Sequence, residues 1–198
     1  MLKIQHTSLL EAGTDEAGRG ALAGPVTAAA VVLPIGIKIP LLNDSKKLTE
    51  KQRYQLRPLI EKSAIAYAVA HVFQEEIDEI NILRASIKAM HLAIKKLKKK
   101  PQHIIVDGNK FCSFKNIPHT CFVKGDCKFQ NIAAASVLAK TYRDDYMKKI
   151  NCEFPKYQWD KNKGYPTNSH RNSIKKNGIT KHHRVSFKLF PDQLKFDF

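Results

Sequence analysis

TDEAGRGALAGPVTAAAVVL, residues 14–33, places two adjacent acids and three glycines directly before a long apolar run. The apolar part, 26–33, is rich in β-branched residues and predicts a buried strand. Residues 9–14 predict a shorter strand that ends at Asp15 and Glu16. Local propensity gives no reason for two acids followed by Gly-Arg-Gly between strands, so this segment is a candidate for function.

The three glycines of GRGALAG, 18–24, follow a predicted strand, as they would in a dinucleotide-binding turn. Such a turn also requires a helix directly after the glycines, because the helix N-terminus binds the pyrophosphate. Pro25 and a β-branched run follow instead, which disfavours a dinucleotide site. A glycine hairpin loop is the remaining simple alternative, but it leaves the two acids and Arg19 unexplained.

The composition is that of a basic globular protein. Lys and Arg number 34 against 18 Asp and Glu, a formal net charge of +16 at pH 7, and 43% of the 198 residues are hydrophobic. That hydrophobic share suffices for one core, and the positive charge favours polyanionic partners, nucleic acid before acidic membranes. From residue 140 onward, 14 Lys and Arg stand against 6 Asp and Glu, a net charge of +8. We therefore expect the C-terminal part to help bind a duplex.

The sequence also argues against several classes of protein. The apolar run 21–35 is interrupted by Gly24, Pro25 and Pro34, which excludes a spanning helix there. The N-terminus lacks a long apolar region with a small-residue cleavage site, so no secretory signal is evident. The four cysteines form no Cys-x-x-Cys pair, and we interpret them as reduced thiols. We expect a cytoplasmic protein and, since no heptads or exposed apolar stripe demand a dimer, a monomer.

The rest of the chain alternates strands and helices. Thr49 with Gln52 forms a capping box at the start of one helix, and Asn81 can cap another. This order is typical of the α/β class, with a mixed sheet flanked by helices and a C-terminal helical segment. Residues 1–150 would form the core, and 151–198 a helical extension that packs on it within one structural unit. We predict helices over 49–62, 82–98, 132–150 and 167–176, and strands over 64–73, 103–107 and 118–123.

Four acids lie at the ends of apolar strands or beside glycine: Asp15, Glu16, Asp107 and Asp126. Strand ends in an α/β sheet are where side chains converge on a ligand crevice. Carboxylates that converge repel each other, and a divalent cation relieves the conflict. Oxygen ligands favour Mg²⁺ or Mn²⁺ over Zn²⁺, and two such ions suit phosphodiester hydrolysis. The alternative left open is that these acids cap loops and occupy solvated turns.

Seven motifs follow one another along nearly the whole chain: DEAGRGALAGPV, NDSKKL, IIVDGNKF, KGD, AAASVLAKTYRD, NKGYPT and HHRVSF. In this order and spacing, the chain resembles the type 2 ribonucleases H (ribonuclease HII). The resemblance implies a ribonuclease H-like mixed sheet with flanking helices. It also implies endonucleolytic cleavage of the RNA strand in RNA–DNA hybrids, and cleavage 5′ of a single ribonucleotide in duplex DNA. The products would carry 3′-hydroxyl and 5′-phosphate ends.

The resemblance also implies roles for residues. Asp15, Glu16, Asp107 and Asp126 match the family's catalytic metal ligands, which would hold two Mg²⁺ or Mn²⁺ ions. Successive strand residues point to opposite faces, so the acids at 15 and 16 share one site only if the strand twists or ends there. Gly18-Arg19-Gly20 is similar to the family's gauge for the ribose 2′-hydroxyl. Glycine suits that role because the backbone can approach a sugar closely.

Further positions match residues that bind the nucleic acid. Tyr165 matches the tyrosine that packs against the sugar next to the ribonucleotide, the alternative being a simple loop anchor. A histidine pair near a basic stretch more often serves packing or the surface than catalysis. The remaining candidates for substrate contacts are Lys46, Lys47, Ser136, Lys140, His183 and Arg184.

The tail PDQLKFDF, 191–198, is similar to the short glutamine-plus-hydrophobic peptides that dock on replication sliding clamps. The residues that carry this similarity are Gln193, Leu194, Phe196 and Phe198. The alternative is that the tail folds back on the core. Two other functions stay open: a non-catalytic protein that binds hybrids or duplexes, and another nuclease of the same fold class, such as a resolvase or integrase-like enzyme.

Overall fold

A single mixed sheet organises the computed structural model, which describes residues 2–42 and 48–190. Its strand order is β3-β2-β1-β4-β5. The strand β1 pairs antiparallel with β2 and parallel with β4, so it lies at the centre of the sheet. The bounds are β1 (Glu11–Ala17), β2 (Val26–Val32), β3 (Ala66–Val72), β4 (His103–Asp107) and β5 (His119–Phe122).

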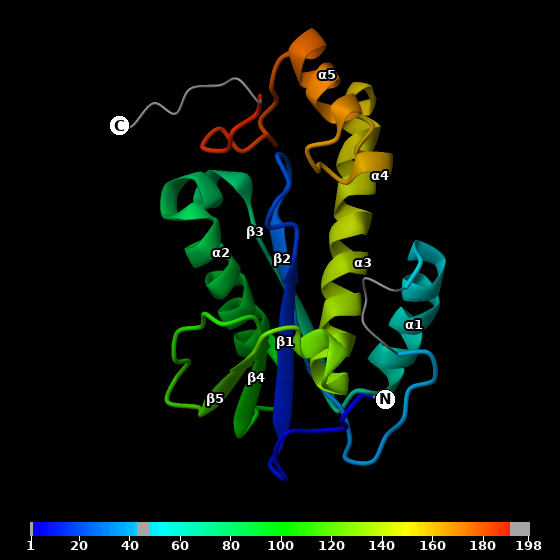
Figure 1. Cartoon of the computed structure of the whole chain (residues 1–198), viewed down its shortest axis with the longest axis vertical. Coiled ribbons are helices and arrows are strands. Elements are labelled where there is room, and N and C mark those ends of the chain that lie inside the picture. The colour runs from blue at the N-terminus through cyan, green and yellow to red at the C-terminus, as the bar shows by residue number, and fades with distance from the viewer. Residues whose placement is uncertain (1, 43–47, 191–198) are drawn as a thin grey trace.

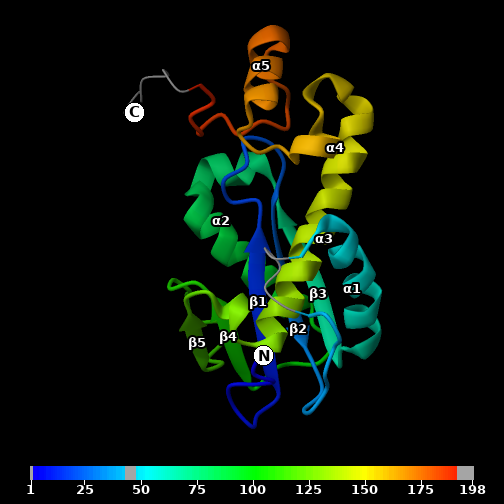
Figure 2. The ribbon, with the colours of Figure 1, turned by 45° about the vertical axis from the view of Figure 1, so that its right-hand side comes forward.

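Helices cover both faces of this sheet. Figures 1 and 2 show α2 on one face and α1 with α3 on the other, while α4 and α5 lie beyond the end of the sheet. In the described part of the chain, no helix is long and apolar enough to cross a membrane. The helices are α1 (Glu50–Ser63), α2 (Gln74–Lys96), α3 (Gln130–Glu153), α4 (Trp159–Asn162) and α5 (Asn168–Asn177), with short 3₁₀ turns η1 (Gly125–Cys127) and η2 (Pro155–Tyr157).

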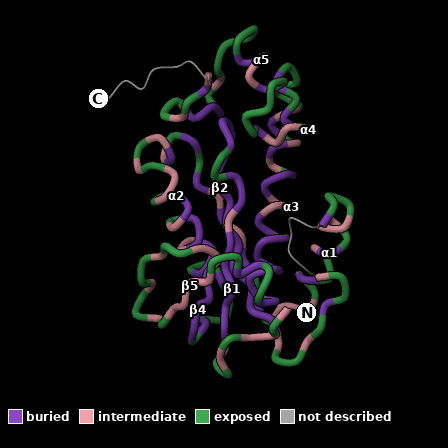
Figure 3. Tube along the Cα trace, viewed as in Figure 1, coloured by how far each residue is buried: buried purple, intermediate pink, exposed green. Residues whose placement is uncertain are grey.

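The strand β2 shows why the sheet is covered twice. Its residues are all buried, and they alternate between two core clusters. Ala28 and Ala30 belong to the cluster on the α2 face, whereas Ala29 and Val31 belong to the cluster under α1 and α3. Figure 3 shows the central strands and much of α3 as buried. The uninterrupted apolar run that predicted a buried strand therefore reflects two packed faces.

The strands and helices predicted from the sequence are confirmed, with two informative differences at their ends. The first strand does not end at Asp15 but continues to Ala17, because its antiparallel pairing with β2 extends to Ala17↔Thr27. The second helix begins at Gln74, well before Asn81, where the backbone turns to φ 66° and breaks the helix. Pairing with β2 lengthened the strand, and a helical segment over 74–80 lengthened the helix.

Both predicted helix caps are present. Thr49 and Gln52 form the capping box of α1, in which each side chain accepts a hydrogen bond from the other residue's backbone N–H. The Oδ1 atom of Asn81 accepts from the backbone N–H groups of Leu83 and Arg84, so it caps the second part of α2. Local sequence therefore determines where these helices start.

The contact between β1 and α3 is unusually close because Gly13 has no side chain. A Cβ atom at residue 13 would lie 2.3 Å from the backbone carbon of Asn131. The buried Asn131 amide joins the layers, since its Nδ2 donates to the Glu11 carbonyl and its Oδ1 accepts from the Leu33 N–H. These contacts set the depth at which α3 lies against the residues that follow in β1.

We expect Gly13→Ala to lower the free energy of unfolding by about 1–3 kcal/mol, because the added methyl group would collide with backbone atoms of α3. Urea denaturation measures the change. Gly20→Ala is the matched control, since a Cβ atom there meets nothing within 4 Å. Equal losses in the two variants would contradict the argument.

Candidate active site

The four candidate acids lie at one end of the sheet but on different elements. Asp15 and Glu16 follow each other in β1 and therefore point to opposite faces. Asp107 is the last residue of β4, and Asp126 is buried in η1 directly before α3. The Oδ1 atom of Asp107 accepts from the Gly125 N–H at 2.7 Å, which ties η1 to the end of β4.

Asp15 is buried against α3. Its carboxylate has a hydrogen bond with Ser136, whose hydroxyl oxygen also accepts from the Lys140 amino group at 2.7 Å. Burial, reinforced by the neighbouring charge of Glu16, raises the pKa of Asp15 to about 8, although Lys140 and Ser136 act in the opposite direction. A further positive charge at this position would therefore be strongly favourable.

Glu16 points into a small hollow of about 190 Å³ on the α2 face. Its Oε1 accepts from the Arg19 guanidinium at 3.3 Å. Its Oε2 is buried and, within the described residues, accepts no hydrogen bond. Burial also raises the pKa of Glu16. The other lining residues are Arg19, Leu83, Ser86, Ile87, Met90, Asp107, Gly108, Asn109 and Lys110.

These oxygen donors fit a hard divalent cation, but they do not form a complete cage. Among the described residues, no three His, Cys, Asp or Glu side chains lie close enough together to hold a metal ion. Asp15 and Glu16 leave the strand on opposite faces, yet the charges of both interact with that of Asp107. Mg²⁺ usually takes only one or two carboxylates and completes its shell with water and substrate phosphate. The buried carboxylates suit that mode of binding.

A second hollow, of about 310 Å³, lies on the other side of the end of β1. Lys140 and Tyr165 line it, and the Tyr165 ring lies 5.3 Å below the guanidinium of Arg143. Tyr165 is 38% exposed, so a ligand can reach its ring. Arg19 of the loop 18–25 lines the first hollow, and Ala17, the last residue of β1 before this loop, lines the second.

Three substrate-contact candidates lie in the interior of the protein. Ser136 is fully buried, and its hydroxyl forms a hydrogen bond with the Asp15 carboxylate. His183 packs against the Trp159 ring, and its Nδ1 accepts from the Thr180 N–H at 2.9 Å. The guanidinium of Arg184 is fully buried and donates to carbonyl oxygens of the loop 18–25. In this structure none of the three presents an exposed side chain to a phosphate, and their contact with substrate stays a prediction.

Other candidates fall outside the described residues, and some lining residues were not anticipated. Lys46, Lys47 and the tail residues Gln193, Leu194, Phe196 and Phe198 belong to the undescribed segments. Asp144 of α3 is buried and lines the second hollow. Lys110 and Lys163 lie within the motifs DGNKF and NKGYPT, so the sequence offered a reason to consider them. Arg53 lies outside every motif quoted above. The unanticipated basic lining residues are Arg53, Lys110, Lys161 and Lys163.

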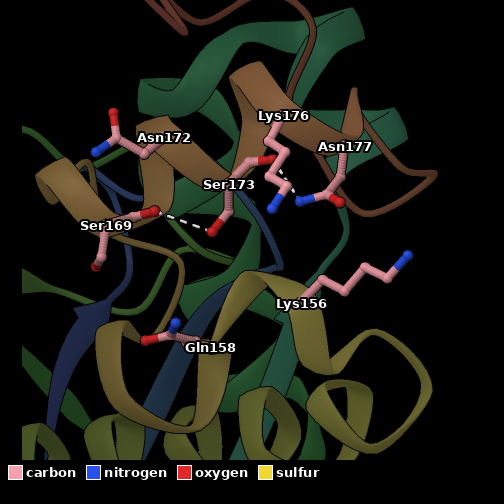
Figure 4. Close-up of a pocket in the computed structure, with 7 residues that line it drawn as sticks. All are labelled: Lys156, Gln158, Ser169, Asn172, Ser173, Lys176 and Asn177. Carbon is pink, nitrogen blue, oxygen red and sulfur yellow. Dashed lines mark hydrogen bonds between the residues drawn. The ribbon is translucent and has the colours of Figure 1, made fainter.

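The C-terminal helices carry a separate polar hollow of about 560 Å³. Figure 4 shows Ser169, Ser173 and Asn177 in a row along α5, with Lys156 on the facing segment. Ser173 and Asn177 bond to backbone carbonyls of their own helix, so the row is largely self-satisfied. The hollow holds lysines and amides but no acid, which suits contact with an anionic surface rather than chemistry. Its lining is Lys156, Gln158, Ser169, Asn172, Ser173, Lys176 and Asn177.

Comparison with known proteins connects this arrangement to one family. A family model described as Ribonuclease HII matches residues 12–190. The ribonuclease HII of Christiangramia forsetii is 64% identical over 198 residues, which is 100% of both chains. The loop 18–25, the C-terminal helices and all of the sheet except Glu11 at the start of β1 fall within the matched range.

Two solved structures have the same fold. The ribonuclease H2 of Pyrococcus horikoshii matches with a TM-score of 0.72 at 27% identity. The match covers 90% of this chain and 94% of the Pyrococcus chain. The PCNA:RNase HII complex of Archaeoglobus fulgidus matches with a TM-score of 0.78 at 26% identity, covering 94% of this chain and 98% of that one. The predicted ribonuclease H-like mixed sheet is therefore confirmed.

Removal of the Asp15 charge should stabilise the metal-free protein in a pH-dependent way. The pKa of Asp15 is about 8 in the folded chain, against an ordinary value of 3.8. The folded state therefore favours the protonated carboxyl, and the contribution of this group to stability falls as pH rises from about 4 to about 8. The gain in free energy of unfolding from Asp15→Asn should be small near pH 4 and grow up to about pH 8.

Urea unfolding in EDTA, at about pH 5, 7 and 9, measures this gain. Glu79→Gln is the control, because Glu79 is an exposed acid on α2 that lines neither hollow. A gain that does not change with pH would show that burial of the Asp15 carboxylate is not its cause.

Proposed function

The chain belongs to the ribonuclease HII family, and from that membership we propose that it cleaves duplex DNA 5′ of single embedded ribonucleotides. As a member of the family it is a metal-dependent endoribonuclease that acts on the RNA strand of RNA–DNA hybrids. The finer activity would begin the removal of ribonucleotides from DNA, in repair and after replication. We place it in the cytoplasm, where a bacterial chromosome lies.

One observation carries the finer proposal: the acids and the sugar gauge are adjacent and linked. Glu16, at the end of β1, accepts a hydrogen bond from Arg19 in the Gly-Arg-Gly loop. The space above Gly20 is open, since a Cβ atom there would meet nothing within 4 Å. Glycine at this position is therefore not required by internal packing, and a sugar can approach the backbone. A ribose on the loop would lie beside the acids.

Different residues of the chain would bind the metal ions, favour the ionised form of Asp15 and contact the phosphate. Asp15, Glu16, Asp107 and Asp126 would hold two Mg²⁺ or Mn²⁺ ions, which supply an activated water and stabilise the leaving 3′-oxygen in phosphodiester hydrolysis. The hydrogen bond from Ser136 and the charge of Lys140 favour the ionised form of Asp15. The half-exposed Arg19 side chain can contact a phosphate. Products with 3′-hydroxyl and 5′-phosphate ends follow from this direction of cleavage.

The second hollow suggests how the flanking nucleotides are held. Tyr165 offers an exposed ring for the sugar next to the ribonucleotide, and Lys140 shares the hollow. Farther along the duplex, the extension 151–198 would contact the backbone. Its lysines, two of which line the hollow of Figure 4, give it a positive surface. Binding should therefore weaken steeply with salt.

Three substrates test this function: one ribonucleotide in duplex DNA, a continuous RNA–DNA hybrid, and a four-way DNA junction, each with Mg²⁺, Mn²⁺ or EDTA. We expect cleavage of the first two, at the 5′ side of the ribonucleotide in the first, and none in EDTA. Cleavage of the junction would favour a resolvase-like enzyme. Binding of all three without cleavage would favour a non-catalytic protein.

Asp15→Asn and Asp107→Asn should each lower cleavage by about 100-fold or more while leaving duplex binding intact, because these acids act on the reacting phosphate rather than on affinity. Single-turnover cleavage and fluorescence anisotropy measure the two quantities separately. Glu79→Gln again provides the control for loss of an acid elsewhere. Retained turnover in either Asn variant would refute the metal-ligand assignment.

A sliding clamp is the partner that we propose for the tail. The Archaeoglobus fulgidus relative was solved in a complex with PCNA, and the tail carries Gln193, Leu194, Phe196 and Phe198 in the spacing of a clamp-docking peptide. Deletion of 192–198 should abolish co-purification with the clamp and leave basal cleavage unchanged. Undiminished clamp binding by the truncated chain would refute the idea.

A further inference from the structure

Arg143 is a fully buried cation on α3, and its hydrogen bonds join two separate loops. Its Nε donates to the Pro25 carbonyl at 2.9 Å, and its NH2 group donates to the Ala23 carbonyl at 3.1 Å. Its NH1 group donates to the Lys163 carbonyl at 2.9 Å. The first two acceptors follow the Gly-Arg-Gly loop, and the third directly precedes Gly164 and Tyr165.

The two loops also interlock around this side chain. A Cβ atom at Gly18 would lie 2.0 Å from Nε of Arg143, so the loop must have glycine there to pass the guanidinium. The Leu22 N–H donates to the Gly164 carbonyl at 2.8 Å, and a Cβ atom at Gly164 would lie 2.5 Å from the Ala23 carbonyl. The positions of the loops are therefore mutually dependent.

The Tyr165 ring is held by the same side chain. The guanidinium of Arg143 lies 5.3 Å from the ring centroid, within the range of a cation–π contact. From the other side, the buried His170 contacts the Tyr165 carbonyl through Nδ1 at 3.0 Å, while its Nε2 accepts from the Trp159 indole. Arg143 therefore contacts the ring of Tyr165, and His170 contacts the backbone of the same residue.

We infer that Arg143 is a positioning residue that fixes the Gly-Arg-Gly loop and Tyr165 relative to each other. The inference rests on the proposed function, in which the loop contacts the ribose and Tyr165 contacts the adjacent sugar. Arg143 touches neither sugar. It sets their spacing, and so favours a ribonucleotide followed by a deoxyribonucleotide over a continuous RNA strand.

Only arginine can make this set of contacts. A guanidinium presents its donors in a planar fork and keeps its charge, so it can reach three carbonyls on two segments at once. A lysine has one amino group and would satisfy at most part of the set. Burial without a bonded carboxylate is costly and lowers the pKa of Arg143, which makes a purely space-filling role a poor explanation.

Arg184 and Arg57 provide comparisons within the same chain. Arg184 donates to the carbonyls of Arg19 and Gly24, so it holds the first loop but not the segment 163–165. Arg57 also lies over an aromatic ring, 3.6 Å from the centroid of Tyr142, but it connects α1 with α3 away from both loops. Arg57→Lys is therefore the matched control for loss of a guanidinium over a ring.

The test compares Arg143→Lys with Arg57→Lys in two measurements on the full chain. The first is the ratio of kcat/KM for one ribonucleotide in duplex DNA to kcat/KM for a continuous hybrid. The second is amide hydrogen exchange in 18–25 and 163–165. We expect Arg143→Lys to lower the ratio about tenfold or more, mainly through kcat, because displacement of contacts by about 1 Å has effects of that size. Exchange should become faster in both loops, and Arg57→Lys should change neither quantity.

Three outcomes would overturn the inference. The first is an equal loss of kcat/KM on both substrates, and the second is unchanged amide hydrogen exchange in the two loops. The third is a further fall in the kcat/KM ratio when Arg143→Lys is added to Tyr165→Leu, because Arg143 would then not act through the ring. If Arg143→Lys does not fold, Gly164→Ala disturbs the same junction with Arg143 intact, and an unchanged ratio would be equally decisive. A wild-type chain that does not cleave at embedded ribonucleotides would refute the proposed function instead. Amide hydrogen exchange in the two loops would then be the remaining test of the role of Arg143.

Discussion

The close contact between β1 and α3 is the constraint on which the site depends. Gly13 lets the helix backbone approach the strand, and Asn131 fastens it there through β1 and the end of β2. From that point the helix rises 1.5 Å per residue. It therefore delivers Ser136 and Lys140 to Asp15, and Arg143 to the loops beyond the strand. One packing contact thus sets the positions of the acid, the sugar gauge and the tyrosine together.

Charges of both signs are buried around the end of β1. The buried acids are Asp15 and Glu16, and the buried basic residues are Arg143 and Arg184. Desolvation of each group costs free energy, which hydrogen bonds offset only in part. A globular core has no need of such an arrangement. Charges held away from water interact strongly with an incoming ligand, so the cost is understandable where a charged phosphate is to be bound and cleaved.

Local sequence determined much of the fold. The Thr49 capping box, the Asn81 cap and the strand His103–Asp107 could be predicted because neighbouring residues decide them. The continuation of β1 through Asp15 and Glu16 could not, because the pairing with β2 extends the strand. The same pairing explains why the side chains of the two adjacent acids leave the strand on opposite faces.

The interior parts of the site were the least predictable. Ser136 and Lys140 are four residues apart and therefore share one helix face, but this spacing does not reveal that the face packs against Asp15. Arg184 matched a motif, yet its burial beneath a loop follows from contacts with residues some 160 positions earlier. Arg143 stood inside a motif without any assigned role, because its acceptors are backbone carbonyls, which carry no sequence signal.

The rigid link through α3 also limits how such a chain can vary in length. Each residue turns a helix by about 100°, so one residue inserted between Asn131 and Arg143 would rotate the guanidinium away from its carbonyls. An insertion in a surface loop does not rotate the residues that follow it in this way, so such loops tolerate insertions. Insertions and deletions compatible with this architecture therefore belong in surface connections between elements, while this part of α3 must keep its residue count.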